Sequence, residues 1–427
     1  MGRPSLSPGR FQASPRRIIA HGPANAQESR DGGGRRMKRR VVIAGAGLAG
    51  LFAAAALAQR GCAVTVIERA PGLGEAGAGI QISPNGARLL ARIGALDAVR
   101  RDGFAPQAAE MRLGRGGARI LSLPLGGRAE ARWGAPYLQV HRADLLTALE
   151  SVARASGVAI RLGEAVTGAD PAGALLLAHG GAVEADVILG ADGVRSDVRA
   201  GLFGPVETRF LGQVAWRGTV AAADLPPGLV APNATVWVGP GRHLVTYYLR
   251  GGALVNFVAV EERRAWAEES WSAPGDVAEL RAAFAGWRPE AAGVLAAARE
   301  CLLWGLFDRP SPPAWRKGRV ALLGDACHPM LPFMAQGAVQ AFEDGAALAR
   351  LLPGAADIPA ALAAYEAARR PRASRVQAAA RANAALFHAG NPASQALRYG
   401  PIALGSRLAP GVAMGRLDWL YGHVEPA

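Results

Sequence analysis

Cysteine is scarce in this chain, and long apolar runs are absent. The three cysteines, Cys62, Cys301 and Cys327, are far apart and odd in number, so neither a disulfide framework nor a metal-ligand spacing is present. We therefore expect no metal site and a reducing compartment, the cytoplasm. The most apolar stretch near the start, residues 52–57, ends before Gln59 and is far shorter than the roughly 18 apolar residues of a transmembrane helix. We expect a protein that is not inserted in a membrane.

The positive charge is concentrated near the start of the chain. The formal net charge is +14 over 427 residues. Residues 1–36 carry seven arginines against Glu28 and Asp31, and residues 38–40 add three basic side chains, so all other residues together hold only +6. This remainder is ordinary for a soluble enzyme, and we do not expect nucleic-acid binding.

Residues 1–36 are rich in Pro, Ser, Gly and Arg and lack apolar periodicity, which is typical of disorder. Three explanations stay open. Arg16-Arg17 suggests a twin-arginine signal, but the apolar run after it has three residues, against the roughly 7–15 that a signal needs. A mitochondrial transit peptide fits the composition but lacks an amphipathic stripe. A start codon placed too early, with Met37 as the true first residue, is the explanation that we favour.

The first glycine motif follows a predicted buried strand. Residues 40–44 are rich in β-branched side chains, and the turn Gly45-Ala46-Gly47-Leu48-Ala49-Gly50 comes directly after them. A helix is predicted over residues 51–60 and a second strand over residues 63–67, which ends at Glu68. This order of strand, glycine turn, helix and strand is the context in which the GxGxxG pattern predicts a dinucleotide site.

Each glycine of this motif has a physical reason. Gly45 permits the tight turn, Gly47 lets the backbone approach a pyrophosphate, and Gly50 lets helix and strand pack closely. The N-terminus of the helix offers free N–H groups and a partial positive charge to the phosphates. Glu68 is placed to accept hydrogen bonds from a ribose hydroxyl. The motif alone leaves FAD and NAD open.

Two later motifs follow strands of the same kind. Residues 184–190 read as a strand that enters Ala191-Asp192-Gly193, and residues 318–323 read as a strand that delivers Asp325 at its carboxyl end. Open α/β sheets bind ligands beyond the carboxyl ends of their strands. An aspartate at that edge suits a chain of sugar-like hydroxyls, such as the ribityl of a flavin.

Together these motifs resemble those of the group A flavoprotein aromatic hydroxylases, the single-component FAD monooxygenases. The resemblance covers about residues 38–424 and is closest to the salicylate, 3-hydroxybenzoate and 6-hydroxynicotinate hydroxylases. The segments that carry it are residues 45–50, 68–69, 77–81, 84–85, 140–145, 190–199, 324–338 and 417–422.

The resemblance implies roles for single residues. Glu68 would hold the adenosine ribose, and Arg142 would lie against the diphosphate and ribityl region. Val166 would offer its backbone to adenine, Asp325 would bind the ribityl chain, and the Asp192 segment is linked in the family to both FAD and NAD(P)H. The predicted FAD-binding residues are Gly45, Gly47, Leu48, Ala49, Gly50, Glu68, Arg69, Arg142, Val166, Asp192, Gly324, Asp325, Gly337 and Ala338.

A proline-stiffened loop follows Asp325, and a helix is predicted from about Gly337 to Arg350. Its N-terminus would point at the pyrimidine edge of the flavin, where its dipole would stabilise the anionic reduced form by roughly 0.3–2 kcal/mol. We interpret His328, on the tight loop after Asp325, as structural rather than as a catalytic base.

The substrate half is predicted to be an antiparallel meander within residues 206–262, with strands at 213–218, 235–238, 243–250 and 253–260. One face would cover the flavin and form the pocket. Many relatives carry Tyr at position 216 and Pro at position 248, where this chain has Trp216 and Tyr248. A tryptophan cannot relay a proton, because its N–H only donates. Arg217 and Arg242 could pair with a substrate carboxylate. The candidate pocket residues are Gln81, Trp216, His243, Tyr247, Pro329 and Gln336.

The predicted fold class is α/β, with a Rossmann-like FAD-binding domain, an interleaved antiparallel-sheet substrate domain and C-terminal helices. We assign residues 38–110, 138–205 and 315–355 to the first domain and residues 111–137 and 206–314 to the second. Residues 356–427 form the helical region, which includes a helix over 358–386 that is broken at Arg370-Pro371. These helices could cover the FAD domain or form a homodimer face.

The resemblance implies an enzyme with FAD as cofactor and NADH or NADPH as co-substrate. It would insert one oxygen atom of O2 into a small aromatic molecule that carries hydroxyl and carboxylate groups, through a flavin C4a-hydroperoxide. We expect no nucleic-acid or membrane partner. Two alternatives stay open. One is a related monooxygenase or epoxidase for a larger natural product, which Trp216 and Tyr248 favour. The other is a non-catalytic FAD-binding redox protein, which Asp325 and Pro329 disfavour.

Overall fold

The computed structural model describes residues 38–74, 78–266 and 273–426. The expectations for residues 1–36, Met37 and Gly77 therefore lie outside the described residues. No helix in the described ranges is long and apolar enough to cross a membrane.

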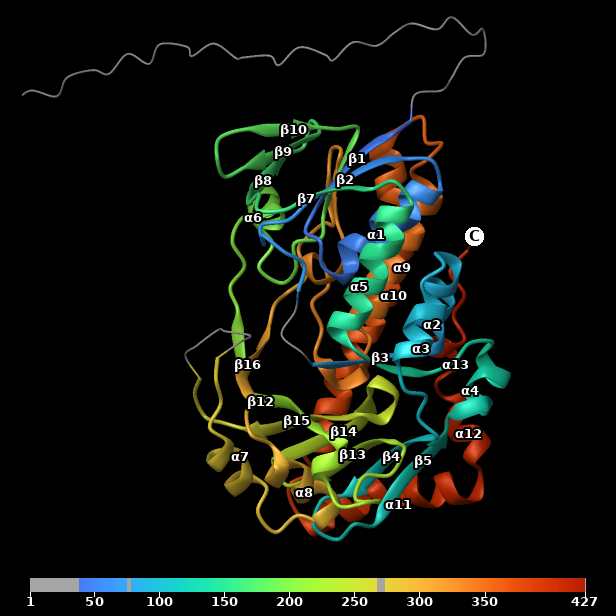
Figure 1. The fold of residues 1–427 in the computed structure, drawn as a ribbon, viewed down its shortest axis with the longest axis vertical. Coiled ribbons are helices and arrows are strands. Elements are labelled where there is room, and N and C mark those ends of the chain that lie inside the picture. The colour runs from blue at the N-terminus through green and yellow to red at the C-terminus, as the bar shows by residue number, and fades with distance from the viewer. Residues whose placement is uncertain (1–37, 75–77, 267–272, 427) are drawn as a thin grey trace, which may run out of the picture. The chain divides into compact units, whose positions relative to one another are not determined.

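A six-stranded sheet, parallel except at one edge strand, is the centre of the first half of the structure (Figure 1). Its strands, in spatial order, are β17 (Arg316–Lys317), β18 (Val320–Leu322), β11 (Val187–Gly190), β1 (Arg40–Ala44), β2 (Ala63–Ile67) and β7 (Ala159–Arg161). The aliphatic side chains of β1, β11 and β18 are almost fully buried, as expected for a parallel sheet covered on both faces. The strands predicted around the three motifs are thus confirmed.

Helices pack along one face of this sheet (Figure 1). They are α1 (Leu48–Gln59), α5 (Arg142–Ala155), α9 (Gly337–Leu351) and α10 (Ile358–Phe387). Helix α1 is rich in alanine and approaches α9 closely at Gly345, where a Cβ atom would lie 2.8 Å from the Phe52 ring and 3.0 Å from Ala53 Cα. The other face carries α6 (Asp197–Phe203) with a small sheet of β8 (Val166–Asp170), β9 (Ala174–Leu177) and β10 (Ala182–Glu184).

A seven-stranded sheet forms the second half. Its strands, in spatial order, are β16 (Leu302–Asp308), β12 (Arg209–Ala221), β15 (Leu254–Glu262), β14 (Arg242–Leu249), β13 (Ala234–Gly239), β4 (Ala108–Leu113) and β5 (Arg119–Pro124). The antiparallel meander β13–β14–β15 is confirmed. Strand β16 was not predicted, and β4 joins the sheet by a parallel pairing with β13.

The two faces of this sheet have different neighbours. Trp216 lies opposite Ala259 and Leu303, and all three belong to a core that includes Leu280 of α7 (Val277–Ala283) and Val294 of α8 (Pro289–Ala297). The residues one step along each strand, among them Ala215, Val260 and Trp304, form another cluster with Phe333 of the loop after Asp325. Because side chains alternate along a strand, only this second face is turned toward the FAD-side loops.

The remaining elements connect these layers. A two-stranded sheet pairs β3 (Gly79–Ile82) with β6 (Leu138–His141), and short helices α2 (Pro84–Arg92), α3 (Leu96–Asp102) and α4 (Gly126–Trp133) lie around it. The chain ends with α11 (Pro392–Leu408), α12 (Pro410–Gly415) and α13 (Asp418–Tyr421). The domain boundaries that we expect from the sequence stay a prediction.

The break expected at Arg370-Pro371 was wrong, because α10 continues through Pro371 to Phe387. A proline inside a helix removes one backbone hydrogen bond. Side chains on both sides of Pro371 offset this cost: Arg369 and Arg372 form ion pairs with Glu343 of α9, and Tyr365 donates a hydrogen bond to the Leu322 carbonyl. Tertiary contacts therefore keep the helix in one piece.

Candidate FAD and substrate site

The three motifs meet at one edge of the parallel sheet. Ala44 is in register with Gly190, and Gly190 is in register with Leu322, so the loops that follow β1, β11 and β18 leave the sheet side by side. Gly45 has a φ of +98°, and a Cβ atom there would lie 2.6 Å from the Ala191 carbonyl oxygen. The predicted convergence of the three loops is confirmed, at the edge where such sheets bind ligands.

The glycines of the first loop differ in what surrounds them. A Cβ atom on Gly50 would lie 1.9 Å from the Gly45 carbonyl oxygen, whereas one on Gly47 would meet no atom within 4 Å. Gly50 is therefore required by the fold, and Gly47 faces open space. Gly47 is also the N-cap of α1, which begins at Leu48 and has neither a side-chain cap nor an acidic residue in its first turn. Uncapped N–H groups beside open space fit a diphosphate.

Glu68 ties the first loop to the end of β2. Its two carboxylate oxygens accept hydrogen bonds from the backbone N–H groups of Ala46 and Ala70, at 2.8 and 2.9 Å. Each oxygen can accept a further hydrogen bond, so this arrangement leaves capacity for ribose hydroxyls. The neighbouring Arg69 is exposed, and Val166 begins β8; their predicted contacts with FAD stay predictions.

Asp325 is the polar group that the loops leave open to a ligand. Its side chain is exposed to the pocket described below, and no described residue forms a hydrogen bond with its carboxylate. The protein around this carboxyl keeps water from it and so raises its pKa, while the charges of His328 and Arg142 lower it. A carboxylate without a protein donor, close to a cation, fits the hydroxyl groups of a ribityl chain.

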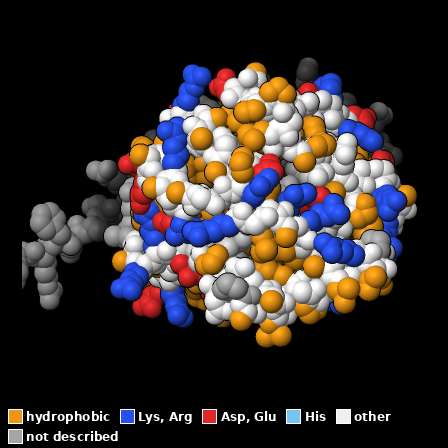
Figure 2. All heavy atoms as spheres, turned by 90° about the horizontal axis from the view of Figure 1, so that it is seen from below, with side chains coloured by type: hydrophobic (Ala, Val, Ile, Leu, Met, Phe, Trp, Pro, Cys, Tyr) orange, Lys and Arg blue, Asp and Glu red, His pale blue; other side chains and the backbone are white. Residues whose placement is uncertain are grey.

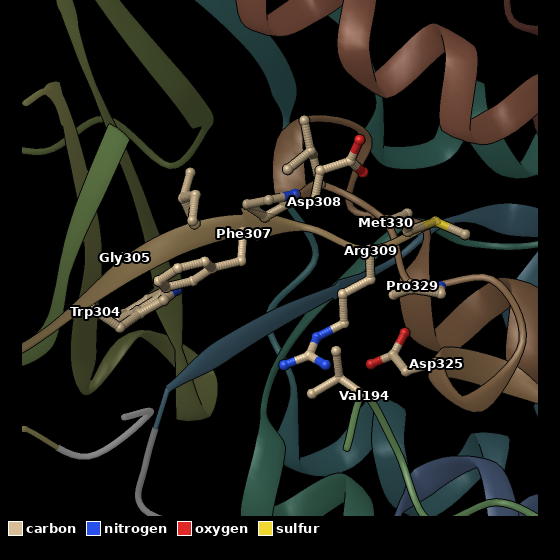
Figure 3. Close-up of a pocket in the computed structure, with 12 residues that line it drawn as sticks. Val194, Trp304, Gly305, Phe307, Asp308, Arg309, Asp325, Pro329 and Met330 are labelled. Carbon is tan, nitrogen blue, oxygen red and sulfur yellow. The ribbon is translucent and has the colours of Figure 1, made fainter. Parts of the chain in front are cut away.

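A pocket of about 140 Å³ lies between these loops and β16 (Figure 3). Figure 3 shows Trp304 and Phe307 at one end and Arg309, Asp325 and Pro329 at the other. Its lining residues are Val194, Trp304 to Arg309, Asp325 and Pro329 to Pro332. The pocket joins the second and third motifs to the seven-stranded sheet. Of the pocket residues predicted from sequence, Pro329 lies in this lining.

A buried ion network fixes the Asp325 loop from behind. The Asp344 carboxylate accepts hydrogen bonds from the Gly324 backbone N–H at 2.9 Å and from Arg369 at 2.9 Å, and it lies 2.5 Å from His328 Nε2. Burial would raise the pKa of Asp344, but the charges of His328 and Arg369 bring it down to about 2. The structure thus agrees with a structural role for His328, whose side chain is fully buried.

The side chains of Gln336 and Asp192 form hydrogen bonds with other parts of the protein. Gln336 donates to the Ser83 hydroxyl at 2.8 Å and accepts from Asn85 at 3.3 Å, directly before α9. Helix α9 begins at Gly337, as predicted, without a side-chain cap. Asp192 accepts hydrogen bonds from the Ser196 hydroxyl and the Val198 N–H, and burial raises its pKa.

Trp216 does not lie at the pocket, which corrects its prediction as a pocket residue. Its indole is fully buried in the core under α7 and α8, edge-on to Phe284 and below the Arg263 guanidinium. Strand alternation places its neighbours Ala215 and Arg217 on the pocket-facing side instead. The sequence pattern did not reveal which of two adjacent side chains would face the flavin.

Gln81 and Tyr247 are brought together from β3 and β14. The Gln81 amide oxygen accepts a 2.5 Å hydrogen bond from the Tyr137 hydroxyl, and burial raises the pKa of Tyr247 while contact with Gln81 lowers it. Backbone approach is close here, since a Cβ atom on Gly79 would lie 2.5 Å from the Tyr247 ring. Tyr137 was missed from sequence, because it precedes a short strand and belongs to no motif.

His243 lies on the pocket-facing side of β14, in register with Val260. Its ring packs against Phe333 and Phe387 with centroids 5.3 and 5.2 Å apart, and it forms a hydrogen bond with His388. Tyr248, in contrast, points to the other face, where its hydroxyl donates to the Val230 carbonyl. Trp304, Phe307 and Arg309 were also missed, since β16 was not recognised as a strand.

Comparisons with known proteins agree with this geometry. The model of the FAD binding domain family matches residues 38–380. The chain is 40% identical over 390 residues to 3-amino-4-hydroxybenzoate 2-monooxygenase PtmB3 of Streptomyces platensis, covering 90% of this chain and 96% of that protein. It is 39% identical to 6-hydroxynicotinate 3-monooxygenase of Pseudomonas fluorescens, covering 79% and 89%. The crystal structure of Klebsiella pneumoniae HpxO with FAD and uric acid superposes with a TM-score of 0.76 at 28% identity, covering 89% and 97%.

Proposed function

The chain belongs to the FAD binding domain family and is an FAD-dependent aromatic monooxygenase, and we propose that its substrate is a single aromatic ring that carries a hydroxyl and a carboxylate. The relatives named above act on 3-amino-4-hydroxybenzoate and 6-hydroxynicotinate, which share this chemistry. A small pocket with aromatic walls supports a ring of this size.

This proposal depends on an FAD site where the three loops meet at one sheet edge, with Asp325 open to a ligand and next to the charge of Arg142. The α1 N-terminus would hold the FAD diphosphate, Glu68 the adenosine ribose and Asp325 the ribityl chain. When bound, FAD would supply the redox chemistry that links NADH or NADPH with O2 and the transfer of one oxygen atom to the ring.

The protein's own contribution is positioning and the exclusion of water. An apolar cluster that includes Trp304 lies between the sheet and the loop after Asp325, and Val258 and Leu331 pack against it. Gln81 and Tyr247 add a polar group next to this region. A dry, apolar site suppresses the side reactions that water would permit.

The structure removes the support for a larger natural-product substrate. That alternative rested on Trp216 and Tyr248, and both side chains point away from the pocket-facing side of the sheet. Trp216 belongs to the core under α7 and α8, and Tyr248 packs against it.

Purified protein is expected to retain FAD and to oxidise NADH or NADPH rapidly only when an aromatic acid is added. The panel to test is 3-amino-4-hydroxybenzoate, 6-hydroxynicotinate and 3-hydroxybenzoate, with mass spectrometry of the product. A mass gain of one oxygen atom supports the proposal. A flavin-loaded protein that none of the three stimulates would refute the substrate class.

We also propose a cytoplasmic homodimer. The three cysteines are buried and unpaired, as in a reducing compartment. Helix α11 exposes Leu397, Leu404 and Leu408, and the face seen from below in Figure 2 shows hydrophobic side chains among Lys and Arg. Light scattering on the wild type and on L404E/L408E tests this, and a monomeric wild type would contradict it.

A further inference from the structure

A chain of three polar side chains runs from β14 to the protein surface. His243 Nδ1 lies 2.7 Å from His388 Nε2, and His388 Nδ1 lies 3.0 Å from Glu262 Oε1. His243 is 1% exposed and the side chain of His388 is 4% exposed, whereas that of Glu262 is 57% exposed. His388 follows α10, so two neighbouring strands and the end of a distant helix connect the interior with solvent.

The order of donors and acceptors in this chain follows from the carboxylate. Ionised Glu262 only accepts, so His388 Nδ1 carries the proton and His388 Nε2 is an acceptor. The Nδ1 of His243 must then be the donor, which leaves its Nε2 with a free lone pair. Gln213 Nε2 also approaches His388 Nδ1, at 3.3 Å, and a turn of this amide would present its oxygen to the same N–H.

His243 Nε2 is the inner end of this series of side chains, on the face of β14 that is turned toward the loop after Asp325. Among the described residues none forms a hydrogen bond with this nitrogen. The ring packs against Phe333, and the residues before Phe333, Leu331 and Pro332, line the pocket. A nitrogen without a protein partner, on a ring that is 1% exposed and packs against an apolar wall, is suited to a polar group of a ligand.

Other charged side chains near these three residues are paired with one another. Arg242 and Glu261 alternate with His243 and Glu262 along their strands and approach each other at 3.9 Å. Arg381 of α10 pairs with Asp308 of β16. Burial and the charge of His388 lower the pKa of His243, and burial lowers the pKa of His388 while Glu262 raises it. Both rings are therefore neutral near pH 7, and each one that receives a proton on one nitrogen releases the proton on its other nitrogen.

We infer that His243, His388 and Glu262 form a relay that carries the hydroxyl proton of the bound aromatic substrate to solvent. This inference rests on the proposed function. The substrate O–H bond breaks and its proton goes to His243 Nε2, the Nδ1 proton of His243 goes to His388 Nε2, and the Nδ1 proton of His388 goes to Glu262 and then to water. The electron pair stays on the phenolate, which makes the ring more reactive toward an electrophilic oxygen. His243 is the catalytic residue, and His388 and Glu262 act through it.

The test measures how fast a bound phenol ionises in FAD-loaded enzyme without NAD(P)H. Stopped-flow ultraviolet absorption records the phenolate as it forms. The probe is 3-amino-4-hydroxybenzoate. We expect H243Q to slow phenolate formation near pH 7 by about 100-fold and H388Q by about 10-fold. E262Q, at the solvent end, should slow it by about 3-fold. Binding of the probe should change by less than about 3-fold in H388Q and E262Q, and added imidazole should restore the rate of H388G.

A matched control is H179Q, which removes an exposed histidine on the turn between β9 and β10, in a different sheet from β14. This variant should ionise the probe at the wild-type rate. Bound flavin and melting temperature show that each variant is folded. If H388Q and E262Q ionise and hydroxylate the probe as the wild type does, the relay is wrong and the proposed function stands. If FAD-loaded wild type binds no phenol of the panel, both are overturned.

Discussion

The parallel sheet and the seven-stranded sheet place their functional residues by different means. At the parallel sheet, the loops after the strands present their backbone at the sheet edge, and the glycines that allow this follow directly after their strands. At the seven-stranded sheet, side chains form the wall, and each one faces the pocket or the opposite core according to its position along the strand. A one-residue difference therefore reverses the role of a side chain in the second region but not of a loop in the first.

The strongest way to break the comparison is to substitute the glycines of the first loop. G50A would place a Cβ atom 1.9 Å from the Gly45 carbonyl oxygen, so the loop must move, and we expect loss of bound FAD together with a destabilised fold, by more than about 4 kcal/mol. In G47A the new Cβ meets nothing within 4 Å. This variant should keep its melting temperature without FAD but lose FAD affinity, as measured by fluorescence titration.

The two variants distinguish a glycine that the fold requires, Gly50, from a glycine that the ligand requires, Gly47. If G47A binds FAD as tightly as the wild type, the diphosphate does not pass close to Gly47, and the proposed position of the cofactor would be wrong.

The second prediction concerns the ion network behind the Asp325 loop. R369M leaves the carboxylates of Glu343 and Asp344 buried without this partner, and we expect a loss of about 3–5 kcal/mol in the free energy of unfolding. R132M removes an exposed pair with Asp418 and should cost far less, because solvent screens an exposed ion pair. Urea denaturation of the FAD-loaded protein compares the two.

The same network predicts a direction for the pH dependence. The folded pKa values of Glu343 and Asp344 are about 2, below their ordinary values of 4.5 and 3.8. Their contribution to stability is therefore present above about pH 4.5 and is lost as the pH falls toward 2. The acid-induced fall should be smaller in R369M, since the two carboxyl pKa values are then no longer held down; an unchanged acid profile would count against the network.

The third prediction isolates the ligand role of Asp325. No described residue forms a hydrogen bond with its carboxylate, so D325N should leave the stability of the FAD-free protein within about 0.5 kcal/mol of the wild type. Loss of charge-assisted hydrogen bonds to ribityl hydroxyls should weaken FAD binding by about 10–100-fold. Equilibrium dialysis of FAD measures the second effect and thermal unfolding the first. A D325N protein with unaltered FAD affinity would contradict the assignment.

The two regions also differ in how far sequence could predict them. The strands around the glycines and Asp325, and the place of these residues at one sheet edge, could be predicted, because each motif directly follows its strand. Trp216 was assigned to the wrong face, because the local sequence pattern does not say which of the two faces of a strand lies toward the pocket. Tyr137 and His388 could not be found, because only tertiary packing brings them to β3 and β14. The continuity of α10 through Pro371 also depends on distant ion pairs.

The comparison is sharpened by a pair of aromatic substitutions on the two faces of the seven-stranded sheet, where the smallest effects are expected. Y247F removes a hydroxyl next to Gln81 and should lower kcat/KM for the aromatic substrate by about 5–10-fold, which is a net hydrogen bond of about 1 kcal/mol. W216F leaves a gap in the core under α7 and should cost about 1–2 kcal/mol of stability with kcat/KM unchanged. Steady-state kinetics and urea denaturation on both variants give the four values. Should W216F change kcat/KM more than Y247F does, the face assigned to the substrate would be the wrong one, and Trp216 would be a pocket residue after all.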